Sequence, residues 1–234
     1  MIDKRTTSTE ALKRLQNGHS VMIGGFGSPG TPFTLINALI EQGAGNLTLI
    51  KNDANEFGIG ISKIFEAGLA DQFIVSHIGL NNLVVDMMNK GILEVEFSPQ
   101  GILAERIRAG GSGFLGFLSD IGIDTILREN KRIIELEDGR QAFIEPALRA
   151  DFALIHAKIS DPTGNLIYSK SSRNFNPLMA MAADIVVAEV EEIVETGSLD
   201  PDSIHTTGAF IDHIVSIKEL TEEYGVLEHH VIQG

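Results

Sequence analysis

The sequence predicts an α/β fold: a single domain with a mixed, mostly parallel sheet between helical layers, and hairpins in the second half. In the first half of the chain, short continuous apolar segments alternate with segments of helical periodicity, which is typical of βαβ units. In the second half, tight turn signals join the apolar segments, which is typical of hairpins. No linker or internal repeat interrupts the sequence, so we expect one domain over residues 1–234.

The first half begins with a helix signal. Thr7-Ser8-Thr9-Glu10 forms a capping box that predicts a helix to about Gln16. Thr31-Pro32 predicts the N-cap and the first position of a second helix, which Gly43 ends. The remaining segments predict strands at 21–23, 47–50, 73–76 and 92–97, and helices at 58–65, 82–89 and 102–108.

The second half begins after Gly110-Gly111, which we expect to end the helix at 102–108. Phe114–Thr125 is glycine-rich and apolar, so we expect a partner or the rest of the fold to cover it. Asp138-Gly139 joins two apolar segments in a clear hairpin, 133–137 and 140–144. The other predicted elements are a hairpin at 152–159 and 166–168, a helix at 175–183, and strands at 185–190 and 210–215.

Composition excludes several classes of function. The net charge of −14 argues against nucleic acid and against an anionic membrane surface as partners. The chain has no cysteine, so it can form no disulfide, thiolate metal site or cysteine nucleophile. The N-terminal residues contain no apolar signal core and no segment approaches the length of a membrane span, so we expect a cytoplasmic protein.

Histidine and glutamate positions predict no metal site. His229-His230 is expected to be a solvated tail, and Asp212-His213 lacks the serine that a catalytic triad needs. His77 and His156 lie on apolar segments, so we expect them in the core. A solvated face after a buried strand is the interpretation of Glu189, Glu191, Glu192 and Glu195.

The segment from Asn17-Gly18 to Pro32 combines a strand, a turn and a helix start. It contains four glycines and two prolines within nine residues, and the helix start offers free N–H groups to an anion. A tight turn that binds nothing is the simpler alternative. A polar loop at Lys51–Asn55 is expected just past the end of the next strand, where open α/β sheets bind ligands.

A second alternative is a dinucleotide site. Gly25-Phe26-Gly27-Ser28-Pro29-Gly30 matches G-x-G-x-x-G, and Asp53 follows at about the spacing of an NAD-dependent dehydrogenase. Pro29 and Pro32 remove two N–H donors that a pyrophosphate would need. The capping signals also place the helix start after the third glycine, which counts against this alternative.

The same segment resembles the signature of family I coenzyme A-transferases at every specified position over sixteen residues: Asn17-Gly18, Val21-Met22-Ile23, Gly24-Gly25-Phe26, Gly30 and Pro32. The resemblance extends along nearly the whole chain, and it is strongest to the α subunits of the acetate/acetoacetate (3-oxoacid) type. Further similar segments are 98–101, 103–111, 164–166, 173–177, 182–184 and 191–194.

The resemblance implies a coenzyme A-transferase fold and an activity shared with a second chain. In the family, a glutamate of the β subunit attacks the acyl-CoA thioester, and its Ser-Glu-Asn-Gly motif is absent here. This chain would supply the acyl-side wall and the oxyanion donors, with short acids such as acetate, butyrate or acetoacetate as acceptors. No cofactor is implied, because coenzyme A enters as part of the substrate.

Gln100 and Asn52 match the positions that the family uses near the oxyanion, where side-chain amides donate hydrogen bonds without carrying charge. Gln100 bonding to local backbone and Asn52 forming a loop turn are the alternatives. The sequence departs from the family at Asp53 and Asn55, where asparagine and glycine are common. The resemblance places Gly24, Gly25, Phe26, Gly27 and Gly30 at the bound acyl group, although for Phe26 we favour a packing role over contact with the ligand. A non-catalytic scaffold subunit is a third hypothesis.

Overall fold

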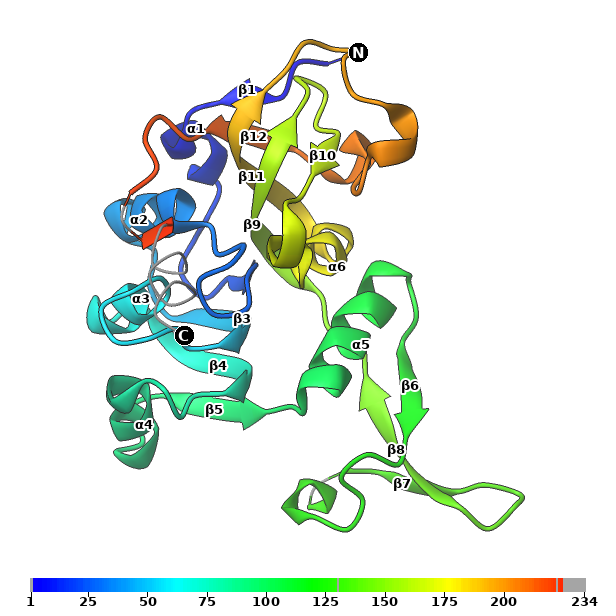
Figure 1. Ribbon diagram of the computed structural model, residues 1–234. Coiled ribbons are helices and arrows are strands. Elements are labelled where there is room, and N and C mark those ends of the chain that lie inside the picture. Colours follow the sequence, from blue (N-terminus) through cyan, green and yellow to red (C-terminus); the bar gives the residue numbers. More distant parts are fainter. Residues whose placement is uncertain (1, 130, 222, 225–234) are drawn as a thin grey trace, which may run out of the picture.

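The computed structural model describes residues 2–129, 131–221 and 223–224. Its main sheet has nine strands among these residues (Figure 1), in the order β1-β12-β11-β9-β2-β3-β4-β5, with β10 paired to β9. Every pairing is parallel except that of β10 with β9. The strands are β1 Arg5–Thr6, β2 Ser20–Ile23, β3 Leu47–Asp53, β4 Ala70–His77, β5 Glu94–Phe97, β9 Ala150–Ser160, β10 Leu166–Ile167, β11 Ala183–Ile193 and β12 His213–Ser216.

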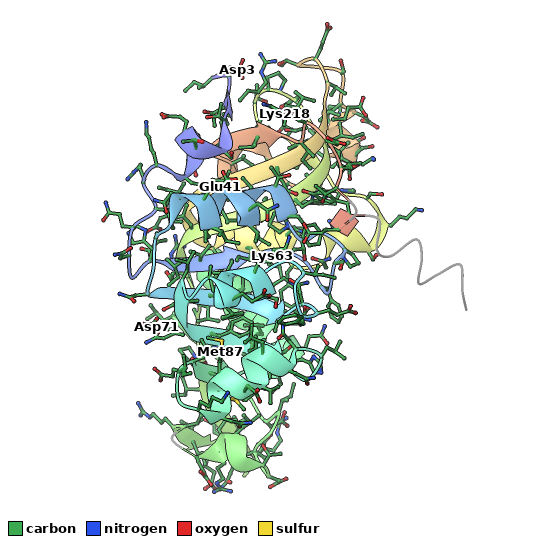
Figure 2. All side chains as sticks on the ribbon, turned by 90° about the vertical axis from the view of Figure 1, so that its left-hand side faces the viewer. Asp3, Glu41, Lys63, Asp71, Met87 and Lys218 are labelled. Carbon is green, nitrogen blue, oxygen red and sulfur yellow. The ribbon has the colours of Figure 1, made fainter. Side chains whose placement is uncertain are left out.

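Helices cover both faces of this sheet. One layer holds α1 Ser8–Leu12, α2 Phe33–Gln42, α3 Ser62–Glu66 and α4 Asn82–Asn89, and Figure 2 looks onto it. The other layer holds α5 Gln100–Gly111 and α6 Asn176–Met181. Side chains alternate between the two cores, so Val21 and Ile23 pack under the first layer and Met22 under the second. The predicted fold class is confirmed, since a mostly parallel sheet lies between two helical layers.

A second, antiparallel sheet of three strands extends from the main body at the bottom of Figure 1. It consists of β6 Gly116–Ser119, β8 Gln141–Pro146 and β7 Ile133–Glu135, and β7 with β8 is the predicted hairpin. Arg106 of α5 anchors this sheet. Its buried guanidinium donates to the Pro146 carbonyl at 3.0 Å and pairs with Glu96 at 2.5 Å.

The small sheet presents apolar side chains to solvent. Leu115 is 95% exposed, and Phe114, Leu118 and Ile121 are each about half exposed. The described part of the chain therefore does not cover residues 114–125. Of the two predicted possibilities, coverage by a partner remains. We call Phe114, Leu115, Leu118 and Ile121 the apolar arm surface.

Several predicted element ends are confirmed. Thr7 caps α1 by accepting the Glu10 N–H at 3.2 Å, and Gly43 ends α2 in the left-handed conformation with φ 79°. The helix at 82–89 and the hairpin of β9 with β10 also agree with the structure.

Other predicted ends are wrong. Pro32, not Thr31, is the N-cap of α2, because the Thr31 hydroxyl donates instead to the Gly27 carbonyl at 2.7 Å. Residues 51–53 belong to β3, since the parallel pairing with β4 continues through Asp53. Helix α1 ends at Leu12, four residues before the expected end. By contrast, the prediction that Gly110-Gly111 ends α5 is confirmed, since Gly111 is the last residue of that helix.

A charged cluster lies inside the protein, beneath the start of α2. Glu189 is fully buried, so its expected place on a solvated face is wrong. Its carboxylate accepts the Leu35 N–H at 3.0 Å and contacts His156 Nδ1 at 3.0 Å, while His156 Nε2 contacts Glu191 at 3.2 Å. The prediction that His156 is a core residue is confirmed. Tyr224 donates to Glu189 at 2.5 Å and ties the end of the described chain to this cluster.

Among the described residues, no helix is long and apolar enough to cross a membrane. The same part of the chain contains no group of three His, Asp or Glu side chains placed to hold a metal ion. His229-His230 lies outside the described residues.

The buried pairing of His156 with two glutamates predicts a pH-dependent stability. Burial alone lowers the pKa of His156, but hydrogen bonds to Glu189 and Glu191 outweigh it and raise that pKa to about 9. The contribution is complete below the ordinary value near 6.5 and is lost as pH rises through 9. We expect the free energy of unfolding of the wild type, relative to His156→Gln, to fall by on the order of 3 kcal/mol between pH 6 and 10. Urea unfolding at both pH values measures it, and a constant difference would contradict the charged pair.

Candidate functional site

A cavity of about 440 Å³ opens where β2, β3 and β4 end and α5 begins. This is the edge of a parallel sheet at which α/β proteins bind ligands, because the loops leaving adjacent strands diverge there. The cavity is lined by Phe26, Gly27, Ser28, Asn52, Asp53, Ala54, Asn55, Glu56, Ser76, His77, Ile78, Leu80 and Gln100. The structure thus brings the two predicted oxyanion donors, Gln100 and Asn52, to one cavity with Phe26 and Gly27.

Asn52 is held in one orientation by its neighbours. Its Oδ1 accepts a hydrogen bond from Ser76 Oγ at 2.9 Å, and its Nδ2 donates to Asp53 Oδ2 at 3.0 Å. Because the Asp53 carboxylate can only accept, the atom of the Asn52 amide that faces it is the one that carries the hydrogens. One of the two Nδ2 hydrogens is engaged by Asp53, so the other is the donor that Asn52 can offer to a ligand.

Gln100 is the exposed first residue of α5. Pro99 precedes it as N-cap and provides no side-chain hydrogen bond to the helix. Within the described part of the chain, the Gln100 amide has no hydrogen-bond partner, so the alternative of bonding to local backbone is not what the structure contains. The free N–H groups of the first helical turn add partial positive charge beside this amide.

Asp53 connects the Asn52 donor to the glycine loop. Its carboxylate accepts the Gly27 N–H at 2.7 Å and the Asn55 N–H at 3.0 Å, in addition to Asn52. Lys51 lies two residues earlier on the same side of β3, fully buried, with Nζ 3.3 Å from Asp53 Oδ1. Burial raises the pKa of Asp53, but the Lys51 ammonium and the three N–H donors outweigh it and hold that pKa below its ordinary value.

The carbonyl of Gly27 is held as firmly as its N–H. It accepts hydrogen bonds from Thr31 Oγ1 at 2.7 Å and Asn55 Nδ2 at 2.8 Å, and Lys51 Nζ lies at 3.4 Å. Gly27 has φ 59°, which favours glycine. Both polar backbone groups of this turn are therefore bonded to residues that follow it by 4 to 28 positions.

Phe26 is 47% exposed and lines the cavity, so the packing role weighed for it is wrong. Three of the predicted loop glycines, Gly24, Gly25 and Gly30, are not among the residues that line the cavity. A Cβ on Gly24 would lie 1.9 Å from Asn176 Oδ1, one on Gly25 2.2 Å from Thr31 Oγ1, and one on Gly30 2.4 Å from the Ser172 carbonyl. Close packing explains these glycines, and their contact with a bound acyl group stays a prediction.

Strand β4 contributes to the cavity, which no sequence motif indicated. Ser76, His77, Ile78 and Leu80 line the cavity from the end of this strand. His77 is exposed there, so its assignment to the core is wrong. The pairing of β4 beside β3 is the signal that would have identified these residues, because neighbouring parallel strands end at the same edge.

The dinucleotide alternative does not fit this geometry. Its ribose-binding residue would be Asp53, whose oxygens already accept bonds from four donors. Helix α2 begins at Phe33, beyond Gly30, whereas the dinucleotide motif opens its helix within the glycine segment. What the cavity does offer is uncharged amide donors beside a helix N-terminus, which stabilise a negative oxygen.

Known proteins are similar to this chain in sequence and in fold. Residues 5–216 match the family model described as Coenzyme A transferase. The acetate CoA-transferase subunit alpha of Escherichia coli is 45% identical over 219 residues, which cover 94% of this chain and 99% of that protein. One of the subunits of the 3-oxoadipate CoA-transferase of Acinetobacter baylyi is 41% identical over 221 residues, 93% of this chain and 96% of that protein.

A solved structure extends the comparison. The acyl-CoA transferase from E. coli O157:H7, crystallised as a thioester complex with CoA, has a TM-score of 0.85 and 22% identity to this chain. The match covers 95% of this chain and 48% of that one, so the chain spans about half the length of that protein. At this identity the likeness concerns the fold.

The buried pair predicts unequal costs for its two members. Asp53→Ala leaves Lys51 without its partner and three N–H groups without an acceptor, so we expect it to lower the free energy of unfolding by about 3–5 kcal/mol. Lys51→Met is expected to cost less, because Asp53 keeps its three N–H donors. Urea unfolding of both variants tests this, with the exposed Asp71→Asn as control. An Asp53→Ala cost equal to or below that of Lys51→Met would contradict the network.

Proposed function

The chain belongs to the coenzyme A transferase family, and from this premise we propose that it is the α subunit of a two-chain cytoplasmic acyl-CoA transferase. The enzyme moves CoA between a short-chain acyl-CoA and a short carboxylic acid such as acetate, butyrate or acetoacetate. It uses no cofactor beyond the CoA thioester itself. The observation that carries the proposal is the cavity in which Asn52 and Gln100 meet beside the glycine loop.

In the proposed mechanism, a glutamate carboxylate of the β subunit attacks the thioester carbonyl. The carbonyl oxygen becomes negative, the CoA thiolate leaves, and an acyl-glutamyl anhydride remains. The thiolate then attacks the glutamyl carbonyl and releases the first acid, giving a glutamyl-CoA thioester that the second acid resolves. Each addition creates an oxyanion, which the free N–H of Asn52 and the Gln100 amide stabilise.

A partner subunit is supported by three observations. The acetate CoA-transferase and 3-oxoadipate CoA-transferase relatives are themselves subunits, and the Ser-Glu-Asn-Gly motif is absent from this sequence. The apolar arm surface, with Leu115 almost fully exposed, has the character of a surface that another chain covers. We assign this surface to the β subunit.

The proposal is tested by acyl exchange with and without a partner. We expect the purified chain alone to transfer no CoA between acetyl-CoA and acetoacetate or butyrate, and a mixture with a cognate β subunit to be active. In the mixture, Gln100→Ala is expected to slow turnover by about 10²-fold, the usual effect of losing one oxyanion donor.

Gln16→Ala, which removes an exposed glutamine remote from the cavity, is the matched control and is expected to keep the wild-type rate. Activity of the lone chain would overturn the two-chain proposal. Unchanged turnover in Gln100→Ala would remove Gln100 from the site.

A further inference from the structure

The charges around the cavity have one sign. Among its thirteen lining residues, all of them described, two are carboxylates, Asp53 and Glu56, and none is lysine or arginine. His77 is the one lining side chain that can become a cation. A carboxylate at the far end of a bound acyl chain would normally be received by an arginine or a lysine.

Asp53 and Glu56 differ in their surroundings. The Asp53 charge is balanced by Lys51 beneath it and by three N–H donors. Glu56 is exposed at the cavity wall, and it forms no ion pair with any residue in the described ranges. The charge that a bound acyl chain meets in this chain's half of the site is therefore that of Glu56.

The remaining walls favour hydrocarbon. Phe26, Ile78 and Leu80 line the cavity, and Phe26 and Leu80 are substantially exposed. Burying a methyl or short alkyl group against these side chains is favourable, whereas burying a charged group without a partner is not. A cavity with apolar walls and one uncompensated carboxylate favours acyl chains whose far end is uncharged over those whose far end carries a negative charge.

We propose that Glu56 is a specificity residue that restricts the cavity to acyl chains with an uncharged end and rejects dicarboxylic acids. The inference rests on the proposed function and names the substrate class of the same site. Two like charges about 4 Å apart repel, and even with full screening by water the penalty corresponds to about fivefold in binding. Selectivity of this kind comes from a repulsive element as much as from attractive contacts.

The test compares acceptors in the two-chain enzyme with acetyl-CoA as donor. The ratio of kcat/KM for butyrate to that for succinate is measured in the wild type, Glu56→Gln and Glu56→Lys. We expect the wild type to favour butyrate, Glu56→Gln to lower the ratio about fivefold or more, and Glu56→Lys to lower it further. Raising ionic strength is expected to lower the wild-type ratio and to leave that of Glu56→Gln nearly constant.

Asp71→Asn is the matched control, because Asp71 is an exposed carboxylate near the other end of β4 (Figure 2). It lies six residues from His77, roughly 20 Å along the strand and beyond a Debye length. Its ratio should equal that of the wild type. A wild type that prefers succinate, or a ratio unchanged in both Glu56 variants, would overturn the inference.

Two other outcomes are distinguishable. Loss of all transfer in Glu56→Gln would identify Glu56 as an attacking carboxylate and would overturn its role in specificity. Failure of the wild-type mixture to transfer CoA to any acid would instead overturn the proposed function.

Discussion

The site depends on how the buried carboxylate of Asp53 holds the turn at Gly27. This carboxylate accepts the Gly27 N–H and also orients the Asn52 amide. The Gly27 carbonyl accepts a hydrogen bond from Asn55, and the Lys51 ammonium lies near it. The Gly27 turn and the Asn52 donor therefore share one partner, the Asp53 carboxylate. Such an arrangement keeps the donor in place before a substrate arrives, which is what electrostatic stabilisation of an oxyanion requires.

The arrangement also explains why this chain works as part of a larger enzyme. Its cavity gathers amide donors, a helix N-terminus and apolar walls, while the carboxylate beside the Asn52 donor, Asp53, is held by four donors. The residues of the apolar arm surface follow α5, the helix that begins with Gln100, along the chain.

Much of the fold follows from local signals, and most of the corrections come from contacts between distant residues. Apolar segments located every strand of the main sheet except the short polar β1, and the capping box located the start of α1. Thr31 does not cap α2, because its hydroxyl donates to the Gly27 carbonyl. Residues 51–53 belong to β3, because β4 pairs with them. Glu189 is buried by Leu35, His156 and Tyr224, which no local pattern brings together. In the site, the resemblance pointed to Asn52 and Gln100, which do share one cavity, whereas the residues of β4 needed the sheet order.

The central claim is that this chain forms the oxyanion side of the site and that the partner carries the attacking carboxylate. Intact-mass spectrometry of the two-chain enzyme, quenched during turnover with acetyl-CoA, tests it directly. The account predicts a mass increase equal to a CoA thioester on the partner and an unmodified mass for this chain. A CoA or acyl adduct on this chain would contradict it.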